Sequence, residues 1–294
     1  ICLALLAIFA APAMPVATSL SFAVLGRDGP TGFGRIRVWG TVGYLILIVA
    51  FPLILSLESN APDLKSGAQN LATIFPIAGT LCVCAALALL FVPSSATTSL
   101  RAKQEDIYLL MRKRSFLRLL GLAFLAFGLL SGPIVLFPIF VTERGGTIDT
   151  VSRLWIPMLL LEIPLIYYAG AGLRRIGARG LITLGIACDG ARWLITALAP
   201  SLVWIFAVQL LHGVVVVGLI IGMQLYVEEE ISPHLRATGQ TILGTIMGLG
   251  AVISHLWAGI ALEHLGSSAP YLIAGPASIV LGIYAWHFLA TSQN

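Results

Sequence analysis

Charged residues are nearly absent from long stretches of this 294-residue chain, which limits how it can fold. Only 10% of the residues are Asp, Glu, Lys or Arg, whereas 58% are hydrophobic. Apolar runs of about 20 residues have the length that an α-helix needs to cross a bilayer. Runs such as LILIVAFPLILSL (45–57) do not alternate as strands of a membrane barrel would. The sequence therefore predicts an all-α polytopic membrane protein.

Nine apolar runs are long enough to be membrane spans. They cover about residues 1–25, 36–57, 71–93, 115–142, 151–173, 180–199, 201–227, 237–262 and 269–290. The first run lacks the basic flank of a secretory signal, so we expect it to be a span cut by the start of the chain. The longest charged segment, 94–114, predicts a cytoplasmic linker, and its QEDIYLLMRKR stretch is typical of an amphipathic surface helix. We therefore expect a truncated N-terminal bundle at 1–93 and a six-helix bundle at 115–294.

The distribution of basic residues predicts the orientation of these spans. Alternate gaps, starting with the first, hold thirteen of the 17 lysines and arginines: Arg27, Arg35, Arg37, Arg101, Lys103, Arg112, Lys113, Arg114, Arg118, Arg174, Arg175, Arg179 and Arg236. The remaining gaps hold only Lys65, Arg144 and Arg153, and Arg192 lies inside a span. Because short cytoplasmic loops are enriched in Lys and Arg, the basic gaps should face the cytoplasm.

Several function classes find no support in the residues. The four cysteines lie inside apolar runs and are interpreted as packing residues. No phosphate-binding glycine loop, paired CxxC, HExxH or GxSxG is present, so we expect no enzyme activity, cofactor or metal. A net charge of +4 without a soluble basic face does not indicate nucleic-acid binding.

Several stretches resemble the lactose permease-like branch of the major facilitator superfamily. GFGRIRVWGTVGYLI (32–46), preceded by APAMPVATSL (11–20), is similar to the junction of the fourth and fifth helices in that branch. LRRIGARGLITLGIACDGARW (173–193), VQLLHG (208–213) and LRATGQTILGTIMGLG (235–250) resemble its eighth to eleventh helices, in the same order. Within that branch, these stretches most resemble phenylpropionate permease and nucleoside–proton symporter relatives.

The resemblance implies both a fold and an activity. The nine spans would be helices four to twelve of a twelve-helix transporter, and Gly244 and Gly248 would allow the eleventh helix to pack closely. The implied activity is proton-coupled symport of a nucleoside, sugar or aromatic acid by alternating access. We expect a monomer in the inner membrane, with lipid, protons and a small solute as its partners. The alternatives are a non-transporting, receptor-like paralogue and, with less support, a membrane-embedded enzyme.

The ionisable residues inside spans are the candidates for proton coupling. A charge at mid-bilayer costs at least about 2.5 kcal/mol, so such groups face a partner or a water-filled cavity. Glu162 is either a proton carrier or a structural partner of Arg192. Asp189 and Arg192 lie three residues apart and can neutralise each other, although the resemblance assigns Arg192 a place beside the coupling carboxylate. His212 either titrates or only forms hydrogen bonds.

Four residues are candidates for substrate binding. By resemblance, Arg37 matches a substrate-binding arginine. It lies near the start of a span, so it is also explained as a topology charge, that is, a basic residue that only sets the orientation of the span. Trp39 is suited to stack on a ring or to anchor at the interface. Gln209 lies on one helix face with His212, and Gln240 is a candidate for hydrogen bonding in the cavity.

Two positions depart from the lactose permease pattern. Val215 stands where that permease has a coupling carboxylate, and Thr18-Ser19 stand where it has a carboxylate that pairs with the substrate-binding arginine. These departures argue against galactoside binding and leave Glu162 as the leading coupling carboxylate.

Overall fold

The computed structural model describes residues 13–58, 74–91 and 104–289, which are almost entirely helical and contain no strand. The first helices are α2 (Ala13–Leu25), α3 (Gly29–Glu58), α5 (Ile74–Leu89) and α6 (Gln104–Arg112). They are followed by α7 (Arg114–Glu143), α8 (Ile148–Tyr167) and α9 (Ala169–Leu198). The next helical run consists of α10 (Leu202–Gln209), α11 (His212–Val215), η4 (Val216–Ile221) and α12 (Gly222–Glu230). Finally come α13 (Arg236–Leu265) and α14 (Ala269–Phe288), and short 3-10 turns at Gly26–Asp28 and Pro233–Leu235 complete the order.

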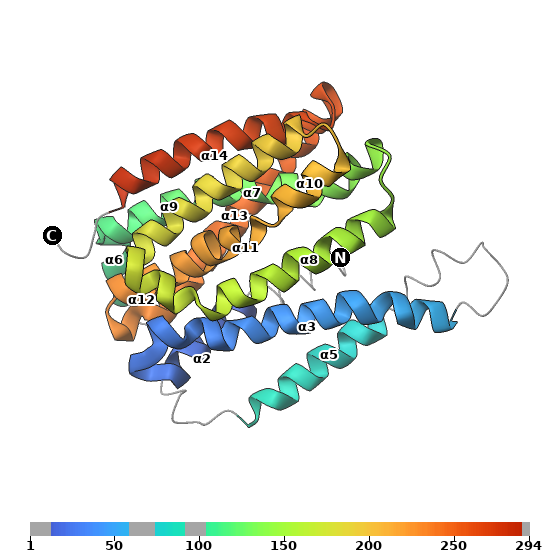
Figure 1. Cartoon of the computed structure of the whole chain (residues 1–294). Coiled ribbons are helices and arrows are strands. Elements are labelled where there is room, and N and C mark those ends of the chain that lie inside the picture. The colour runs from blue at the N-terminus through green and yellow to red at the C-terminus, as the bar shows by residue number, and fades with distance from the viewer. Residues whose placement is uncertain (1–12, 59–73, 92–103, 290–294) are drawn as a thin grey trace.

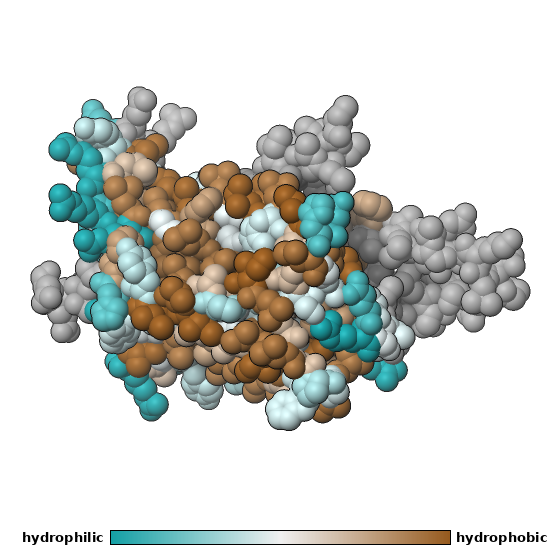
Figure 2. All heavy atoms as spheres, turned by 90° about the horizontal axis from the view of Figure 1, so that it is seen from above, coloured by the Kyte–Doolittle hydropathy of each residue, from teal (hydrophilic) through white to brown (hydrophobic). Residues whose placement is uncertain are grey.

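The described helices form a bundle with a hydrophobic outer surface. Six helices or helical runs are long and apolar enough to cross a membrane: Thr31–Ala50, Arg114–Glu143, Ala169–Leu198, Leu202–Glu230, Pro233–Leu265 and Ala269–Phe288. In Figure 2, hydrophobic side chains cover the middle of one face, and hydrophilic ones gather towards two opposite ends. The prediction of an all-α polytopic membrane protein is therefore confirmed, whereas the count of nine spans stays a prediction.

One end of the bundle collects the segments that the sequence marks as basic. Figure 1 shows α6, α12 and the turn between α8 and α9 at the same end of the molecule. α7 starts at Arg114 and α13 at Arg236, next to α6 and α12 respectively. The predicted helix in the charged segment is present as α6, whereas the linker and the division into two bundles stay predictions. Residues 92–103, including Arg101 and Lys103, lie outside the described residues.

The turn between α8 and α9 differs from the predicted span at 151–173. α8 ends at Tyr167, and α9 begins after a single residue. Within α9, Gly177 has φ 67° and ψ 171°, which breaks the helix at the gap predicted after 173. A positive φ is readily adopted by glycine because it has no Cβ. The chain thus turns at Tyr168, earlier than expected, and turns again at Gly177.

The predicted span at 201–227 is an interrupted helix. α10 ends at Gln209, and α11 begins at His212 after two residues. The following six residues, Val216–Ile221, form a π-helix. Such π-helical turns are rare and occur frequently at functional sites. The interruption places His212 at the start of a new helical turn, in the middle of the bundle.

α3 packs directly against the end of α8 and the start of α9, beside which it lies in Figure 1. A Cβ at Gly34 would overlap the carbonyl group of Ile166, and a Cβ at Gly170 would overlap that of Thr31. The backbones of these helices therefore touch at the basic end of the bundle, and only glycine fits at these positions.

α13 packs closely against α7, but not through the predicted glycine. Gly248 is exposed, and a Cβ there would meet no atom of the described residues within 4 Å. The close approach instead involves Gly132 and Ser254, where the Gly132 N–H donates to Ser254 Oγ over 2.7 Å. A second bond joins Trp257 Nε1 to the carbonyl oxygen of Gly128 over 2.7 Å. The expectation of close packing was therefore wrong for Gly248, and for Gly244 it stays a prediction.

Candidate substrate and proton site

An ion pair on α9 forms the centre of the candidate site. Arg192 Nη2 lies 2.9 Å from Asp189 Oδ1, and both side chains are 2% exposed. Trp193 Nε1 donates to the second carboxylate oxygen over 3.1 Å. The Arg192 guanidinium carbon also lies 3.8 Å from the centroid of the Trp193 ring, a cation–π distance. The contact that the spacing predicts between Asp189 and Arg192 is thus present.

The interrupted helix supplies two further partners of Arg192. Arg192 Nη1 donates to Gln209 Oε1 over 3.2 Å and lies 3.0 Å from His212 Nδ1. A guanidinium can only donate, so Nδ1 must be the acceptor. The proton of the neutral imidazole is then on Nε2. His212 is therefore an uncharged hydrogen-bonding group in this arrangement, with its N–H directed away from Arg192.

Glu162 faces that N–H from α8. His212 Nε2 lies 3.7 Å from Glu162 Oε2, and the Thr41 hydroxyl of α3 donates to Glu162 Oε1 over 2.8 Å. Arg37 lies one helical turn before Thr41 on α3 and is half-buried. A polar chain thus runs from α3 through Glu162 and His212 to the ion pair on α9. Glu162, Asp189, Arg192, Gln209 and His212 are called the central cluster below.

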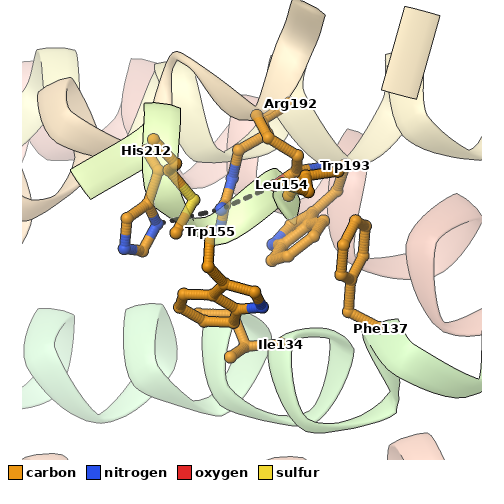
Figure 3. A pocket seen from close by; sticks show the side chains of 9 residues that line it. Ile134, Phe137, Leu154, Trp155, Arg192, Trp193 and His212 are labelled. Carbon is orange, nitrogen blue, oxygen red and sulfur yellow. Dashed lines mark hydrogen bonds between the residues drawn. The ribbon is translucent and has the colours of Figure 1, made fainter. Parts of the chain in front are cut away.

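A pocket lies directly beside the central cluster. It is lined by Ile134, Phe137, Leu154, Trp155, Met158, Arg192, Trp193, Gln209 and His212. Figure 3 shows side chains from α7, α8 and α9 converging on one space, with Arg192 and His212 joined by a hydrogen bond. One wall is therefore polar and the others are apolar, as is usual in sites for small organic ligands.

The remaining sequence candidates lie away from this pocket. Gln240 donates to the carbonyl oxygen of Gln224 over 2.9 Å and to Glu228 Oε1 over 3.3 Å. Trp39 is 71% exposed. Of the eight predicted site residues, the structure brings together the five of the central cluster, and Arg37 lies one helical turn from Thr41, which contacts Glu162. The roles of all eight stay predictions.

Sequence reasoning overlooked four residues that contact the central cluster or line the pocket: Thr41, Trp155, Trp193 and Thr196. Thr41 lies four residues after Arg37, and Thr196 four after Arg192, so helical spacing places each on a face already marked as functional. Thr196 accepts a hydrogen bond from Gln209 Nε2 over 3.0 Å. Among the described residues, no group of three or more His, Cys, Asp or Glu side chains could hold a metal ion.

The fold and the cluster define a multi-pass helical membrane protein with a small, partly charged pocket between its helices. The model of the MFS_1 like family matches residues 1–273, and the chain belongs to this family. The predicted membership of the major facilitator superfamily is therefore confirmed.

The relatives carry the names of permeases and transporters. The chain is 27% identical over 286 residues to a maltose permease of Geobacillus stearothermophilus, covering 96% of this chain and 68% of the permease. It is 22% identical over 278 residues to a probable 3-phenylpropionic acid transporter of Escherichia coli, covering 91% of this chain and 68% of that transporter. The Escherichia coli fucose:proton symporter has the same fold, with a TM-score of 0.67 at 14% identity over 93% of this chain and 72% of the symporter. The chain thus spans about two thirds of the length of these curated relatives, which are named as a permease and a transporter and not as enzymes.

Proposed function

We propose that the protein is a proton-coupled secondary transporter of a small organic solute. The observation that carries this proposal is the polar chain from Thr41 through Glu162 and His212 to Arg192. Ionisable groups are rare inside membrane helices and mark proton or substrate pathways. Glu162 is the proton carrier, because it is buried, faces His212 and has contacts from two other helices.

Alternating access follows from the position of this polar chain of side chains, because it joins the two proposed bundles. Thr41 belongs to the proposed N-terminal bundle (1–93), and Glu162 to the proposed C-terminal bundle (115–294), joined by a cytoplasmic linker at 94–114. Their hydrogen bond lies beside the backbone contact between α3 and the α8–α9 turn, so separation of the two bundles at the basic end breaks both. Uptake of a proton by Glu162 changes this bond and so biases the two arrangements.

The protein is expected to work as a monomer in the cytoplasmic membrane, with its basic end facing the cytoplasm. The solute is a sugar, a nucleoside or an aromatic acid. The names of the relatives, which include a maltose permease, a probable 3-phenylpropionic acid transporter and a xanthosine permease, support this range of substrates.

The proposal is tested by proton flux in vesicles that contain the full-length protein. Maltose, 3-phenylpropionate and xanthosine are added in turn under anaerobic conditions, and a pH electrode records alkalinisation of the medium. We expect alkalinisation with at least one of the solutes. Silence with every solute, from a protein that is inserted and folded, would favour a receptor-like paralogue instead.

A variant of the proposed proton carrier sharpens the test. Glu162→Gln keeps the shape and most hydrogen bonds but cannot release a proton, so proton-driven accumulation should fail while equilibrium exchange of the solute persists. Glu263→Gln, an exposed glutamate on α13, is the matched control and should accumulate solute normally. Normal accumulation by Glu162→Gln would remove Glu162 from the coupling role.

A further inference from the structure

Two arginines are exposed at the start of α7. Arg114 and Arg118 are one helical turn apart, so they lie on the same face of the helix. The Arg118 guanidinium carbon lies 5.4 Å from the centroid of the Phe288 ring, at the end of α14. Among the side chains that the structure describes, neither arginine forms a hydrogen bond or an ion pair. The donors of both guanidinium groups are therefore free to bind an anion.

The charges at the start of α7 have the wrong sign for the helix dipole. The N-terminus of a helix carries a partial positive charge, which favours acidic side chains nearby. The first turn of α7 contains no acidic residue and begins with Arg114, and its N-cap residue, Lys113, makes no side-chain capping bond. The Lys113 ammonium group donates instead to the backbone carbonyl oxygen of Glu230. A bound anion would compensate the positive charges that meet at this corner.

The face of α7 that carries the two arginines continues as an exposed apolar stripe. Leu117, Phe124 and Leu125 are exposed, and so is Gly121 between them. A Cβ at Gly121 would meet no described atom within 4 Å, so the stripe has a notch at this glycine. The exposed positions recur every three or four residues from Arg114 onwards, which keeps them on one side of the helix. This side of α7 thus matches a molecule with an anionic head and a hydrocarbon tail.

The short helix before α7 indicates that this corner lies at a bilayer surface. α6 is held against the bundle through Leu110, which is 1% exposed, whereas Tyr108 and Leu109 are exposed. Arg112 lies over the Tyr108 ring, with 5.5 Å between its guanidinium carbon and the ring centroid. Short helices with exposed apolar side chains and basic residues lie in the headgroup region of a membrane. In Figure 1, α6 and the end of α14 are at the same end of the molecule.

We propose that the corner between α6, α7 and α14 binds an anionic phospholipid. The phosphate lies between Arg114 and Arg118, and an acyl chain follows the exposed stripe of α7 past Gly121. Guanidinium groups form charge-assisted hydrogen bonds with phosphate oxygens, and basic clusters beside membrane helices attract anionic headgroups. A free phosphate ester would satisfy the arginines but would leave the apolar stripe without a partner. The proposal does not depend on proton coupling.

The test is lipid binding to the purified full-length protein in detergent. Native mass spectrometry separates the protein with and without one bound lipid, and the probes are dioleoylphosphatidylglycerol, dioleoylphosphatidylcholine and glycerol 3-phosphate. The phosphatidylglycerol should bind about tenfold more tightly than the phosphatidylcholine, and glycerol 3-phosphate should not displace it. Equal binding of the two lipids would overturn the preference for an anion. Displacement by glycerol 3-phosphate would assign the arginines to a soluble phosphate ester and refute the lipid.

A double variant assigns the headgroup to the arginine pair. Arg114→Gln combined with Arg118→Gln should weaken binding of the phosphatidylglycerol about thirtyfold. Arg174→Gln combined with Arg175→Gln is the matched control, because it removes the same charge from two exposed arginines at the same end. Neighbouring residues on a helix do not face each other, and distant charges are screened by salt, so the control should change binding less than about threefold. Equal weakening by both double variants would contradict the site.

A glycine variant tests the path of the acyl chain. Gly121→Leu fills the notch and should weaken binding of the phosphatidylglycerol about tenfold, through lost contact with about two methylene groups. Gly248→Leu adds the same side chain in open space on α13 and should bind like the wild type. Thermal unfolding of each variant shows that it is folded. Unchanged affinity in a folded Gly121→Leu variant would refute the placement of the chain along α7.

Discussion

Two buried polar clusters of similar composition occupy different depths in this bundle. The central cluster has a counterpart at the basic end, called the end cluster, which consists of Thr18, Gln224, Glu228, Arg236 and Gln240. Each contains one carboxylate–arginine pair and at least one buried glutamine, and each is joined to an early helix through a threonine. Gln224 Nε2 donates to Thr18 of α2 over 3.4 Å, much as Thr41 of α3 donates to Glu162.

The two clusters differ in what surrounds their charges. In the central cluster, both members of the ion pair are 2% exposed, and the pocket lies beside them. In the end cluster, Arg236 is 32% exposed and lies 3.4 Å from Glu228, and neither residue lines the pocket. The same residue types thus build the proposed solute site in the middle of the bundle and a contact between helices near its basic end. Composition alone does not distinguish these roles, but depth in the bundle does.

The largest expected effect is the loss of one charge from the central pair. Asp189→Ala leaves Arg192 buried without its counter-ion, and breaking a buried pair in this way costs about 3–5 kcal/mol. Glu228→Ala leaves an arginine that reaches solvent but also removes a 3% exposed carboxylate that accepts a hydrogen bond from Gln240, so its cost should be smaller, about 1–3 kcal/mol. The free energy of unfolding of each full-length variant, measured in mixed micelles, checks this difference.

A double variant separates loss of charge from loss of packing. Asp189→Ala combined with Arg192→Leu removes both charges and should recover part of the lost stability. Equal destabilisation by Asp189→Ala and Glu228→Ala would abolish the distinction between the clusters.

A second prediction concerns the glycine that holds His212 close to Glu162. A Cβ at Gly213 would lie 2.8 Å from Leu165 Cδ1 and 3.0 Å from the Glu162 Cα. Gly213→Ala should therefore push α8 and α11 apart and cost about 1–3 kcal/mol in unfolding free energy, with impaired proton coupling. Gly248→Ala, in open space on α13, is the control. It should be neutral or stabilising by up to about 1 kcal/mol. A fully active Gly213→Ala variant with normal stability would show that this contact is dispensable.

The helices were largely predictable because apolar runs of membrane length carry a strong signal. The contact between Asp189 and Arg192 was also predictable, since three-residue spacing on a helix brings side chains together. The early turn at Tyr168 and the π-helix after His212 were not predicted, because both lie inside continuous apolar sequence with no polar break. Local hydropathy does not reveal where a buried helix changes its hydrogen-bonding pattern.

The contacts between helices were the part that a single sequence could not supply. Glu162 and His212 lie fifty residues apart in the chain, and nothing in their local spacing indicates that they face each other. Gln240 has the same local features as Gln209, an amide within an apolar helix, yet it bonds Glu228 near the basic end. The depth that separates the two clusters depends on tertiary packing.

The third prediction tests whether the central cluster extends into α3. Arg37→Ala removes a half-buried positive charge one helical turn from Thr41, the residue that donates to Glu162, and should reduce solute uptake about tenfold, the effect of roughly 1.4 kcal/mol. Arg37→Lys should restore uptake only in part, because an ammonium group lacks the planar donors of guanidinium. Arg35→Ala, an exposed neighbour, is the control. Wild-type uptake by the inserted Arg37→Ala variant would return Arg37 to the role of a topology charge.

The smallest expected effect is on solute affinity when the end cluster is changed. Gln240→Leu removes hydrogen bonds to Gln224 and Glu228 that lie away from the pocket, so the KM for uptake should change by less than about twofold. Gln209→Leu removes a partner of Arg192 in the pocket wall, and loss of a hydrogen bond to a charged group, worth about 1.5–3 kcal/mol, should raise KM about tenfold or more. Initial uptake rates, corrected for the amount of inserted protein, check both values. A tenfold rise in KM for Gln240→Leu with unchanged stability would place Gln240 in the solute path, as the sequence alone predicts, and the distinction by depth would then fail for this residue.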